Sequence, residues 1–363
     1  MRKTRKFAFF SLFFSVLLLC ILFFLRTSAE KPEQDFKTGP MPELILSTYQ
    51  SWVGEEGLGS LVIPVFEKRF QCKIRVMTSP DGGSLLSRLE MDFRRSQSKK
   101  PHVVVGIDQY LWPRAQSYSE GWKDWRPFGY SDLTSQYRID GFLPYSVGTL
   151  TFLADSHVLN SRHVPTPHSL LDLLRPELSR QLILEDPRTS TPGLVFILYS
   201  FTVLGEAQAF SFWHKLRDQW LTLPQSWDAA YSMFLRQQAP LVWSYFSSQA
   251  FHQSQGQAQY QALVFTEGHP IQIEGAFLVR DSWSSMREKE LAQKFLEYLL
   301  SPEVQGKVPQ KNWMFPVRND VALPSSFQGI PNPLSVPTVS LPLDQKSIQR
   351  VLVLWREAVG AGR

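Results

Sequence analysis

The segment between residues 44 and 107 contains three short apolar runs: LILSTY (44–49), CKIRVM (72–77) and HVVVGI (102–107). Each run is typical of a β-strand, and the last has the continuous hydrophobicity of a strand that is buried on both faces. Helical patterns lie between the runs, over residues 57–66 and 85–89. This alternation predicts a βαβ unit, so the first half of the chain is expected to be α/β with a parallel sheet.

The rest of the chain continues the alternation of strands and helices. Strands are expected over residues 147–153, 181–185 and 241–245, and helices over residues 194–204, 227–235, 289–300 and 348–359. A return crossing is expected at residues 262–265 and 271–273. The pattern predicts two lobes, one formed by residues 43–146 and 267–363 and the other by residues 147–266. Crossing strands would leave a cleft between the lobes, which is the usual place for a small ligand.

Composition and charge narrow the range of functions. The chain has 363 residues, of which 43% are hydrophobic, as in ordinary globular proteins. Its 38 basic and 33 acidic residues give a net charge of +5. Five basic residues lie in residues 1–29, which contain no acid, and removing them leaves 33 basic against 33 acidic residues. The body is therefore neutral, which argues against nucleic-acid binding because that affinity needs a basic surface.

Residues 1–29 have the features of an export leader. A basic N-terminus precedes an apolar run over residues 7–25, and the small residues before Glu30 suit cleavage by signal peptidase. At 1.5 Å per residue the run would span about 28 Å, which is close to the thickness of a bilayer core. We favour a cleaved signal peptide and keep a retained N-terminal anchor as the alternative. Either leader places the body outside the cytoplasm, after a polar linker at residues 30–42.

The sequence contains no established catalytic or metal-binding motif. G-x-S-x-G, H-E-x-x-H, C-x-x-C, the P-loop and the dinucleotide G-x-G-x-x-G are all missing from it. Its two cysteines, Cys20 and Cys72, cannot form a disulfide framework because Cys20 lies in the leader. Catalysis is therefore not supported, and no metal site is predicted.

Five histidines are candidate polar groups. His157, His163 and His168 fall within twelve residues, but their spacing suits no standard metal site, so we interpret them as part of a solvated loop. His252 and His269 have aromatic and acidic neighbours in the sequence. They are candidates for polar contacts in the cleft, although a lone histidine more often has a structural role.

Aromatic residues are frequent at the predicted strand ends and loops. The candidates are Tyr49, Trp52, Trp227, Tyr245, Phe251 and Trp313. Most tryptophans and tyrosines in any domain pack in its core or rim. Several of them lining one cleft would instead hold a flat or cationic ligand by stacking and cation–π attraction.

Two turns that lead into helices are candidate anion sites, DGGS (81–84) and TSTPG (189–193). Each would present free backbone N–H groups at the positive end of a helix, which suits a phosphate or a carboxylate. The alternative interpretation is ordinary N-capping by the polar side chains of the turns.

Several segments of the body form a recognisable set: DPRTSTPGL (186–194), SY (244–245), EGH (267–269) followed by Gln272 and Glu274, LAQKFL (291–296) and NWMFPV (312–317). Together they closely resemble the thiamine-binding periplasmic proteins of bacterial thiamine ABC importers. The resemblance runs from about Leu44 to Trp355. The first and last segments are specific, whereas LAQKFL is shared by many extracytoplasmic solute-binding proteins.

The resemblance implies an α/β, two-lobed periplasmic-binding-protein fold of type II with its ligand cleft between the lobes. It implies a periplasmic protein that is not an enzyme and that closes over thiamine or thiamine phosphates. The ligand would be delivered to an inner-membrane ABC permease, with thiamine as the transported ligand and no cofactor. We expect a monomer because no assembly motif is visible in the sequence.

The resemblance also implies a set of ligand-binding residues: Tyr49, Asp81, Gly82, Ser190, Trp227, Tyr245, Phe251 and Trp313. The tyrosines and tryptophans would form walls around the pyrimidine and thiazolium rings. Aromatic faces and a carboxylate would stabilise the positive charge of the thiazolium ring. Asp81 would contact the hydroxyethyl or phosphate end of the ligand, and Ser190 would be a further polar contact.

The chain departs from the family pattern at three places. Glu56 stands where the family commonly has Trp, and Phe251 stands where it has Tyr. The Asp-Tyr-Gly of the first crossing is replaced by SVG at residues 146–148. Phe251 keeps a ring without a hydroxyl donor, and Glu56 replaces a stacking surface with a negative charge.

Three alternatives to thiamine binding remain open at this point. In the first alternative, the ligand is another cationic or heteroaromatic solute. In the second, it is ferric iron, which favours paired tyrosines, and this sequence has no two adjacent tyrosines. The chain would otherwise be an exported thiamine-degrading enzyme, which needs a cysteine nucleophile in the cleft. Cys72 is the candidate, and we expect it on or just before an inner strand, buried and inert.

Overall fold

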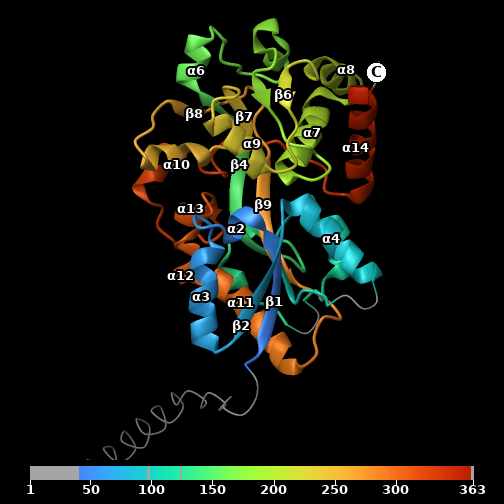
Figure 1. Ribbon diagram of the computed structural model, residues 1–363, viewed down its shortest axis with the longest axis vertical. Coiled ribbons are helices and arrows are strands. Elements are labelled where there is room, and N and C mark those ends of the chain that lie inside the picture. Colours follow the sequence, from blue (N-terminus) through green and yellow to red (C-terminus); the bar gives the residue numbers. More distant parts are fainter. Residues whose placement is uncertain (1–40, 96–98, 123–124, 361–363) are drawn as a thin grey trace, which may run out of the picture. The chain divides into compact units, whose positions relative to one another are not determined.

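The computed structural model describes residues 41–95, 99–122 and 125–360 (Figure 1). The predicted leader and the linker up to residue 40 lie outside these residues. From Pro42 onward the chain forms one compact unit. Across the described ranges, no helix combines the length and the hydropathy that crossing a membrane requires.

The secondary structure follows the predicted alternation. The strands are β1 (Glu43–Tyr49), β2 (Lys73–Ser79), β3 (Val103–Asp108), β4 (Leu143–Asp155), β5 (Leu182–Ile183), β6 (Trp220–Thr222), β7 (Leu241–Tyr245), β8 (Tyr260–Ala262), β9 (Ile271–Leu278) and β10 (Phe315–Pro316). The α-helices are α2 (Gln50–Val53), α3 (Gly59–Phe70), α4 (Gly82–Arg94), α5 (Trp112–Ala115), α6 (Ser156–Ser161), α7 (Thr191–Leu204), α8 (Glu206–Leu216), α9 (Trp227–Leu235), α10 (Ser248–Ser254), α11 (Met286–Leu300), α12 (Pro302–Gln305), α13 (Val308–Lys311) and α14 (Gln345–Gly360). Short 3₁₀ turns are η1 (Gln116–Tyr118), η2 (Tyr130–Asp132), η3 (Ser135–Tyr137), η4 (Leu171–Leu174), η5 (Pro176–Leu178) and η6 (Ser325–Phe327).

The strands form one sheet with the order β2-β1-β3-β9-β4-β7-β5-β6, and β8 and β10 also pair with β4. We call β2, β1 and β3 the first subsheet, and β7, β5 and β6 the second subsheet; β9 and β4 lie between them in the strand order. β1 is parallel to β2 and β3, and β5 is parallel to β6 and β7. β9 is antiparallel to β3. The predicted α/β class, with a parallel sheet in the first half of the chain, is confirmed.

Strand β4 links the two subsheets. Its residues 143–149 pair with β9, and its residues 150–154 pair with β7. All thirteen of its residues are buried, as expected of a strand that is covered on both faces. Figure 1 shows β4 and β9 running side by side between the two subsheets. The crossing strands inferred from the sequence are therefore β4 and β9.

The other predicted return strand is shorter than expected. β8 ends at Ala262, and residues 263–265 are not part of any strand. At this point the Thr151 hydroxyl of β4 donates to the carbonyl oxygen of Leu263. A turn at Gly268, with φ of 83°, then leads the chain into β9.

The last helix departs from the predicted lobe boundaries. α14 packs against α7 and α8, which flank the second subsheet, and Arg350 of α14 pairs with Glu206 of α8 at 2.6 Å. The buried face of α14 includes Ile348 and Trp355. The prediction that all of residues 267–363 return to the first lobe is therefore wrong for α14, because its apolar stripe is covered by the second group of helices.

Cys72 also lies in a different place from the one expected. It precedes β2, which is the edge strand of the first subsheet and not an inner strand. The side chain is nevertheless 1% exposed, because it packs into the core beneath α3. Its burial agrees with the expectation of an inert thiol.

Candidate ligand-binding site

A cavity of about 490 Å³ lies between residues of the two subsheets. Tyr49 at the end of β1 and Tyr245 at the end of β7 line it, as do Gln272 and Glu274 of β9. Ligands of open α/β sheets commonly bind outside the carboxyl ends of the strands. The volume falls within the range of small-molecule sites, which is roughly 300–1,000 Å³. Both the position and the size of the cavity therefore indicate a site for a small molecule.

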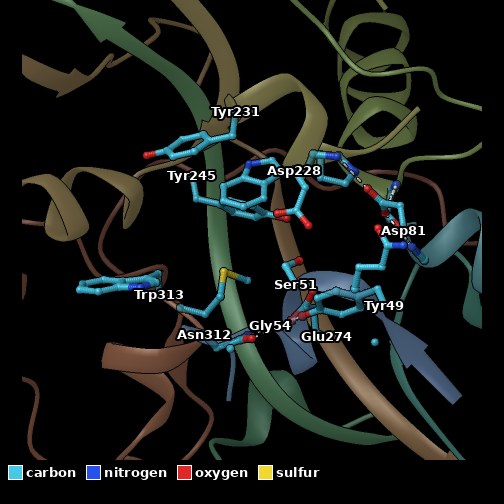
Figure 2. Close-up of a pocket in the computed structure, with 18 of the residues that line it drawn as sticks. Tyr49, Ser51, Gly54, Asp81, Asp228, Tyr231, Tyr245, Glu274, Asn312 and Trp313 are labelled. Carbon is cyan, nitrogen blue, oxygen red and sulfur yellow. Dashed lines mark hydrogen bonds between the residues drawn. The ribbon is translucent and has the colours of Figure 1, made fainter. Parts of the chain in front are cut away.

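Aromatic rings form much of the cavity wall: Tyr49, Trp227, Tyr231, Tyr245, Phe251 and Trp313. Trp227 and Tyr231 lie one turn apart on α9 and stack with ring centroids 4.5 Å apart. Phe251 of α10 meets Trp313 edge-on, with centroids 5.0 Å apart. Figure 2 shows that the labelled rings come from separate elements and border a common space. Such an arrangement suits a flat ligand that can be contacted on more than one face.

Two backbone positions allow this arrangement of rings. Gly106 of β3 has a φ of 98°, and a Cβ there would lie 2.2 Å from Cδ1 of Tyr49. Glycine is therefore required for the Tyr49 ring to lie across β3. Trp313 follows α13 with a φ of 49°, which is uncommon for a residue with a large side chain. Such conformations are concentrated at functional sites, where the surrounding structure maintains them.

The carboxylate of Glu274 lies at the base of the cavity. Its Oε2 accepts hydrogen bonds from the hydroxyls of Tyr49 (3.2 Å), Tyr145 (3.1 Å) and Ser146 (2.9 Å). The Nδ2 of Asn312 donates to the same oxygen at 3.0 Å. Hydrogen bonds to a carboxylate are stronger than those between neutral groups, and four of them here fix the position of the Glu274 side chain. Glu274 therefore presents a negative charge to the cavity.

The tyrosines around Glu274 are held as neutral donors. Burial raises the pKa of Tyr49 well above its ordinary value, and the charge of Glu274 raises it further. The pKa of Tyr145 is raised by the same two causes, with burial the larger. Beside them, the Tyr245 hydroxyl donates to Oε1 of Gln272 at 2.8 Å. The base of the cavity is thus rich in oriented acceptors and suits a ligand with donors or a positive charge.

Asp81 closes one end of the cavity with hydrogen bonds to backbone groups. Its Oδ1 accepts from the N–H of Gly82 (2.7 Å) and of Thr191 (3.2 Å), and its Oδ2 accepts from the N–H of Trp227 (3.0 Å). Burial raises the pKa of Asp81 to about 6, although these hydrogen bonds act to lower it. The carboxylate thus caps α4 and also binds the first residues of α7 and α9.

This geometry changes the interpretation of the two turns that were candidate anion sites. The anion at the starts of α4 and α7 is the carboxylate of the protein's own Asp81. Both helices are therefore capped, which is the alternative interpretation of these turns. The cap of α7 comes from Asp81, a residue distant in sequence. Asp81 and Gly82 line the cavity, whereas Ser190 is 1% exposed and its neighbour Thr191 lines the cavity instead. That these residues contact a ligand stays a prediction.

The rim of the cavity carries a salt bridge. Glu56, which stands where the family commonly has Trp, pairs with Lys311 of α13 at 2.9 Å. The Glu56 side chain is 76% exposed, so its charge is both paired and solvated. Asp228 of α9 also lines the cavity; burial raises its pKa, and the nearby Ser51 hydroxyl acts to lower it. Glu56 thus lies in solvent with a basic partner, whereas Glu274 accepts hydrogen bonds at the base of the cavity.

Several cavity residues were missed in the sequence analysis. Tyr231 lies four positions after Trp227, and this spacing places both rings on one face of a helix. Gln272 and Glu274 alternate along β9 and therefore share a face of the sheet. These spacings could have indicated the three residues. Nothing in the local sequence around Asn312 indicates its hydrogen bond to Glu274.

The five histidines are not part of the cavity lining. His252 contacts the Tyr231 hydroxyl through Nε2 at 2.8 Å and Oε1 of Gln257 through Nδ1 at 2.7 Å, so it supports a wall residue from behind. His269 accepts from the Phe265 N–H. The structural role favoured for a lone histidine therefore describes both residues, because both rings are used in hydrogen bonds within the protein. Within the described ranges, no group of three or more His, Cys, Asp or Glu is arranged to hold a metal.

Asp108 at the end of β3 predicts a pH dependence of stability. Its Oδ1 accepts from the N–H of Tyr110 and Leu111, and burial raises its pKa to about 8. Between the unfolded value near 3.8 and this value, the folded state keeps a proton that unfolding releases. The contribution of Asp108 to stability is therefore largest at the acidic end of this window and is lost as the pH rises toward 8.

Asp108→Asn should reduce this pH dependence while keeping the acceptor for both N–H groups. We expect the free energy of unfolding to decrease less between pH 5 and pH 8 in the variant, by about 1 kcal/mol or more. Urea unfolding at the two pH values measures the difference. Equal slopes for the variant and the unmodified protein would contradict the assignment.

Comparison with known proteins identifies the family of the chain. Residues 104–332 match the family model described as bacterial extracellular solute-binding protein. The chain is 34% identical over 293 residues to a thiamine-binding periplasmic protein of Escherichia coli (strain K12). The aligned region covers 80% of this chain and 86% of the relative. It is also 34% identical over 321 residues to a thiamine-binding periplasmic protein of Salmonella typhimurium, which covers 88% of this chain and 94% of that relative.

A solved structure gives the same result. A periplasmic thiamin-binding protein superposes with a TM-score of 0.77 and 31% sequence identity, over 89% of this chain and 98% of that chain. The similarity therefore extends over both subsheets and the cavity between them.

Proposed function

This chain belongs to the bacterial extracellular solute-binding proteins, and we propose that it binds thiamine outside the cytoplasm and delivers it to the permease of an ABC importer. The fold is that of a two-lobed periplasmic binding protein of type II. The relatives and the solved structure that carry a thiamine-binding name support the choice of ligand. Export by the N-terminal leader, a periplasmic location and a monomeric state are parts of the same proposal.

The observation that carries the proposal is the combination of stacked rings with an ionised carboxylate in one cavity. Thiamine has two flat heteroaromatic rings, one of which carries a permanent positive charge. Aromatic faces attract such a cation, and each contact is worth about 0.5–2 kcal/mol. Glu274 supplies a negative charge at the base of the same space. Among the described residues of the lining, Lys311 is the one with a basic side chain, and Glu56 neutralises it.

We further propose that the two subsheets, each with its helices, are the lobes of the protein. α14 then belongs to the second lobe, and β4 and β9 form the hinge. Closure of the lobes would remove the ligand from water and strengthen its electrostatic contacts. This assignment keeps the predicted boundaries near residues 146 and 267 and changes them for α14 and for η6, which packs against α10.

Binding without chemical conversion is also part of the proposal. A thiamine-degrading enzyme would need a thiolate in the cavity, and Cys72 is outside the lining. Burial raises the pKa of Cys72 to about 11, which disfavours the reactive thiolate. Ferric iron is disfavoured because the Tyr49 and Tyr145 hydroxyls are already donors to Glu274.

Isothermal titration calorimetry of the purified protein tests the proposal. Thiamine should bind with a stoichiometry near one, and unrelated organic cations and ferric citrate should bind much more weakly. Thiamine monophosphate and diphosphate in the same series would establish which forms are accepted. Chromatography of a thiamine solution after incubation with the protein should show no loss of thiamine. Absence of thiamine binding, or turnover of thiamine, would overturn the proposal.

Trp313→Ala should weaken thiamine binding by at least about 1 kcal/mol, which is roughly fivefold in Kd. Trp313 lines the cavity and meets Phe251 edge-on, so its removal takes away one wall and loosens a second. Calorimetric titration measures the change, and circular dichroism checks that the variant is folded. An unchanged Kd would remove Trp313 from the site.

A further inference from the structure

The carboxylate of Asp81 connects elements of the two subsheets. Asp81 follows β2 and precedes α4, both of which belong with the first subsheet. Two of its three hydrogen-bond donors, the N–H groups of Thr191 and Trp227, begin α7 and α9. Those helices pack on the second subsheet. Figure 2 shows Asp81 at the edge of the cavity, with dashed contacts to the neighbouring backbone.

The segment after Asp81 lies directly against the backbone of the 189–191 turn. A Cβ on Gly82 would lie 2.6 Å from Oγ1 of Thr191, and a Cβ on Gly83 would lie 2.6 Å from the carbonyl oxygen of Thr189. The N–H of Ser84 donates to that same carbonyl at 3.2 Å. Gly83 therefore meets the Thr189 backbone directly, Gly82 meets the Thr191 side chain, and neither glycine leaves space for a side chain of its own.

Asp81 also determines where one aromatic wall lies. Trp227 is held at its backbone by Asp81 and at its ring by a hydrogen bond from Nε1 to the Ser244 hydroxyl, at 2.9 Å. Tyr49, which faces the same cavity, comes from the first subsheet. The separation of these two walls therefore depends on the contact that Asp81 makes.

We propose that Asp81 is a positioning residue that acts as a closure latch, binding the N-termini of α7 and α9 to that of α4 and so holding the cavity in its enclosing form. The inference rests on the proposed function, because it concerns the closure of the same site. The negative carboxylate lies at the positive ends of helices of fourteen and nine residues, which favours this contact once water is excluded. Opening of the lobes would return the carboxylate and both N–H groups to solvent.

The latch and a direct ligand contact lead to different results for a variant. A direct contact to the hydroxyethyl or phosphate end would change the ranking of thiamine and its phosphates. A latch that acts through the protein backbone should weaken every accepted ligand by a similar factor. It should do so through faster dissociation, because an open form can still admit the ligand.

Asp81→Ala and Asp81→Asn are the first variants to test. We expect the dissociation rate of thiamine, measured by stopped-flow tryptophan fluorescence, to rise about tenfold in Asp81→Ala, with the association rate changed less than about threefold. The dissociation rate in Asp81→Asn should lie between those of the unmodified protein and Asp81→Ala, because the amide NH₂ would face the Trp227 N–H. Thiamine and thiamine monophosphate should be affected equally. A selective loss of one of these ligands would overturn the latch in favour of direct contact.

Gly83→Ala tests the latch without altering the cavity lining, since Gly83 is not part of it. The added Cβ meets the Thr189 carbonyl only when the segments are docked, and alanine favours α4 itself. We expect faster thiamine dissociation, with circular dichroism as the check that the ligand-free variant is folded. Asp344→Asn, at the aspartate that accepts from the Ser347 N–H at the start of α14, is the matched control and should leave dissociation unchanged.

A ligand-independent measurement separates failure of the latch from failure of thiamine binding. Spin labels at residues 91 and 208, which are exposed on α4 and α8, report the separation of the two groups of helices. In the ligand-free protein, Asp81→Ala should shift the distance distribution to longer values. Unchanged distances together with unchanged dissociation would overturn the latch. If the unmodified protein does not bind thiamine, the proposed function fails, and the spin-label distances still decide the latch.

Discussion

Glu274→Gln should weaken thiamine binding at neutral pH by about 30- to 100-fold. The variant removes the negative charge at the base of the cavity, and its amide would place donors against the hydroxyls of Tyr145 and Ser146, which now donate to Oε2. The cation would then lose its counter-charge while the surrounding donors lose their acceptor. Calorimetric titration of the variant measures the Kd, with circular dichroism and thermal unfolding as checks on the fold.

Glu56→Gln is the matched control for Glu274→Gln. Both carboxylates line the cavity, but Glu56 is exposed at the rim and paired with Lys311. Exposed ion pairs contribute about 0–1 kcal/mol, so the control should change the Kd by less than about fivefold. Equal losses in the two variants would contradict the role of Glu274 as the counter-charge of the ligand.

Trp227→Ala should weaken thiamine binding by about 30-fold or more, which is the range of interface residues that dominate affinity. The indole is stacked on Tyr231, lies 6.4 Å from the Tyr245 ring and is fixed by its bond to the Ser244 hydroxyl. Truncation would remove a preorganised aromatic face and would release the Tyr231 ring from its stack. Stopped-flow fluorescence or calorimetry measures the loss.

Two further variants make this result interpretable. Trp227→Phe keeps a ring and loses the hydrogen bond to Ser244, so it should recover most of the affinity. Trp283→Ala removes an indole outside the cavity that donates to Glu120, and it should leave the Kd unchanged even if stability decreases. A Kd for Trp227→Ala that matches the unmodified protein would exclude Trp227 from the walls of the site.

Much of the fold could be predicted because strands and helices leave periodic patterns in the chain. The runs LILSTY, CKIRVM and HVVVGI correspond to β1, β2 and β3 within one or two residues. The amphipathic pattern of α14 predicted the helix but not its partner. An apolar stripe indicates that a face will be covered, and it carries no information on which other helix covers it.

The sequence predicted the aromatic part of the candidate site but not its carboxylate. The rings of Tyr49, Trp227, Tyr245, Phe251 and Trp313 were named from the sequence, and all five line one cavity. The prediction that each contacts a ligand is still to be tested. Glu274 was not assigned a role in binding, because an isolated acidic residue on a strand does not indicate its environment.

The chain by itself determined the order of strands and helices, the neutral charge of the body and the residues that carry rings. These properties follow from local composition and from hydrophobic periods of two and 3.6 residues. The tertiary structure alone decided that Glu274 has four donors, that Asp81 binds the starts of two distant helices and that α14 packs against α7 and α8. A carboxylate can be buried only where donors compensate for the loss of water, and here those donors come from residues far apart in the sequence.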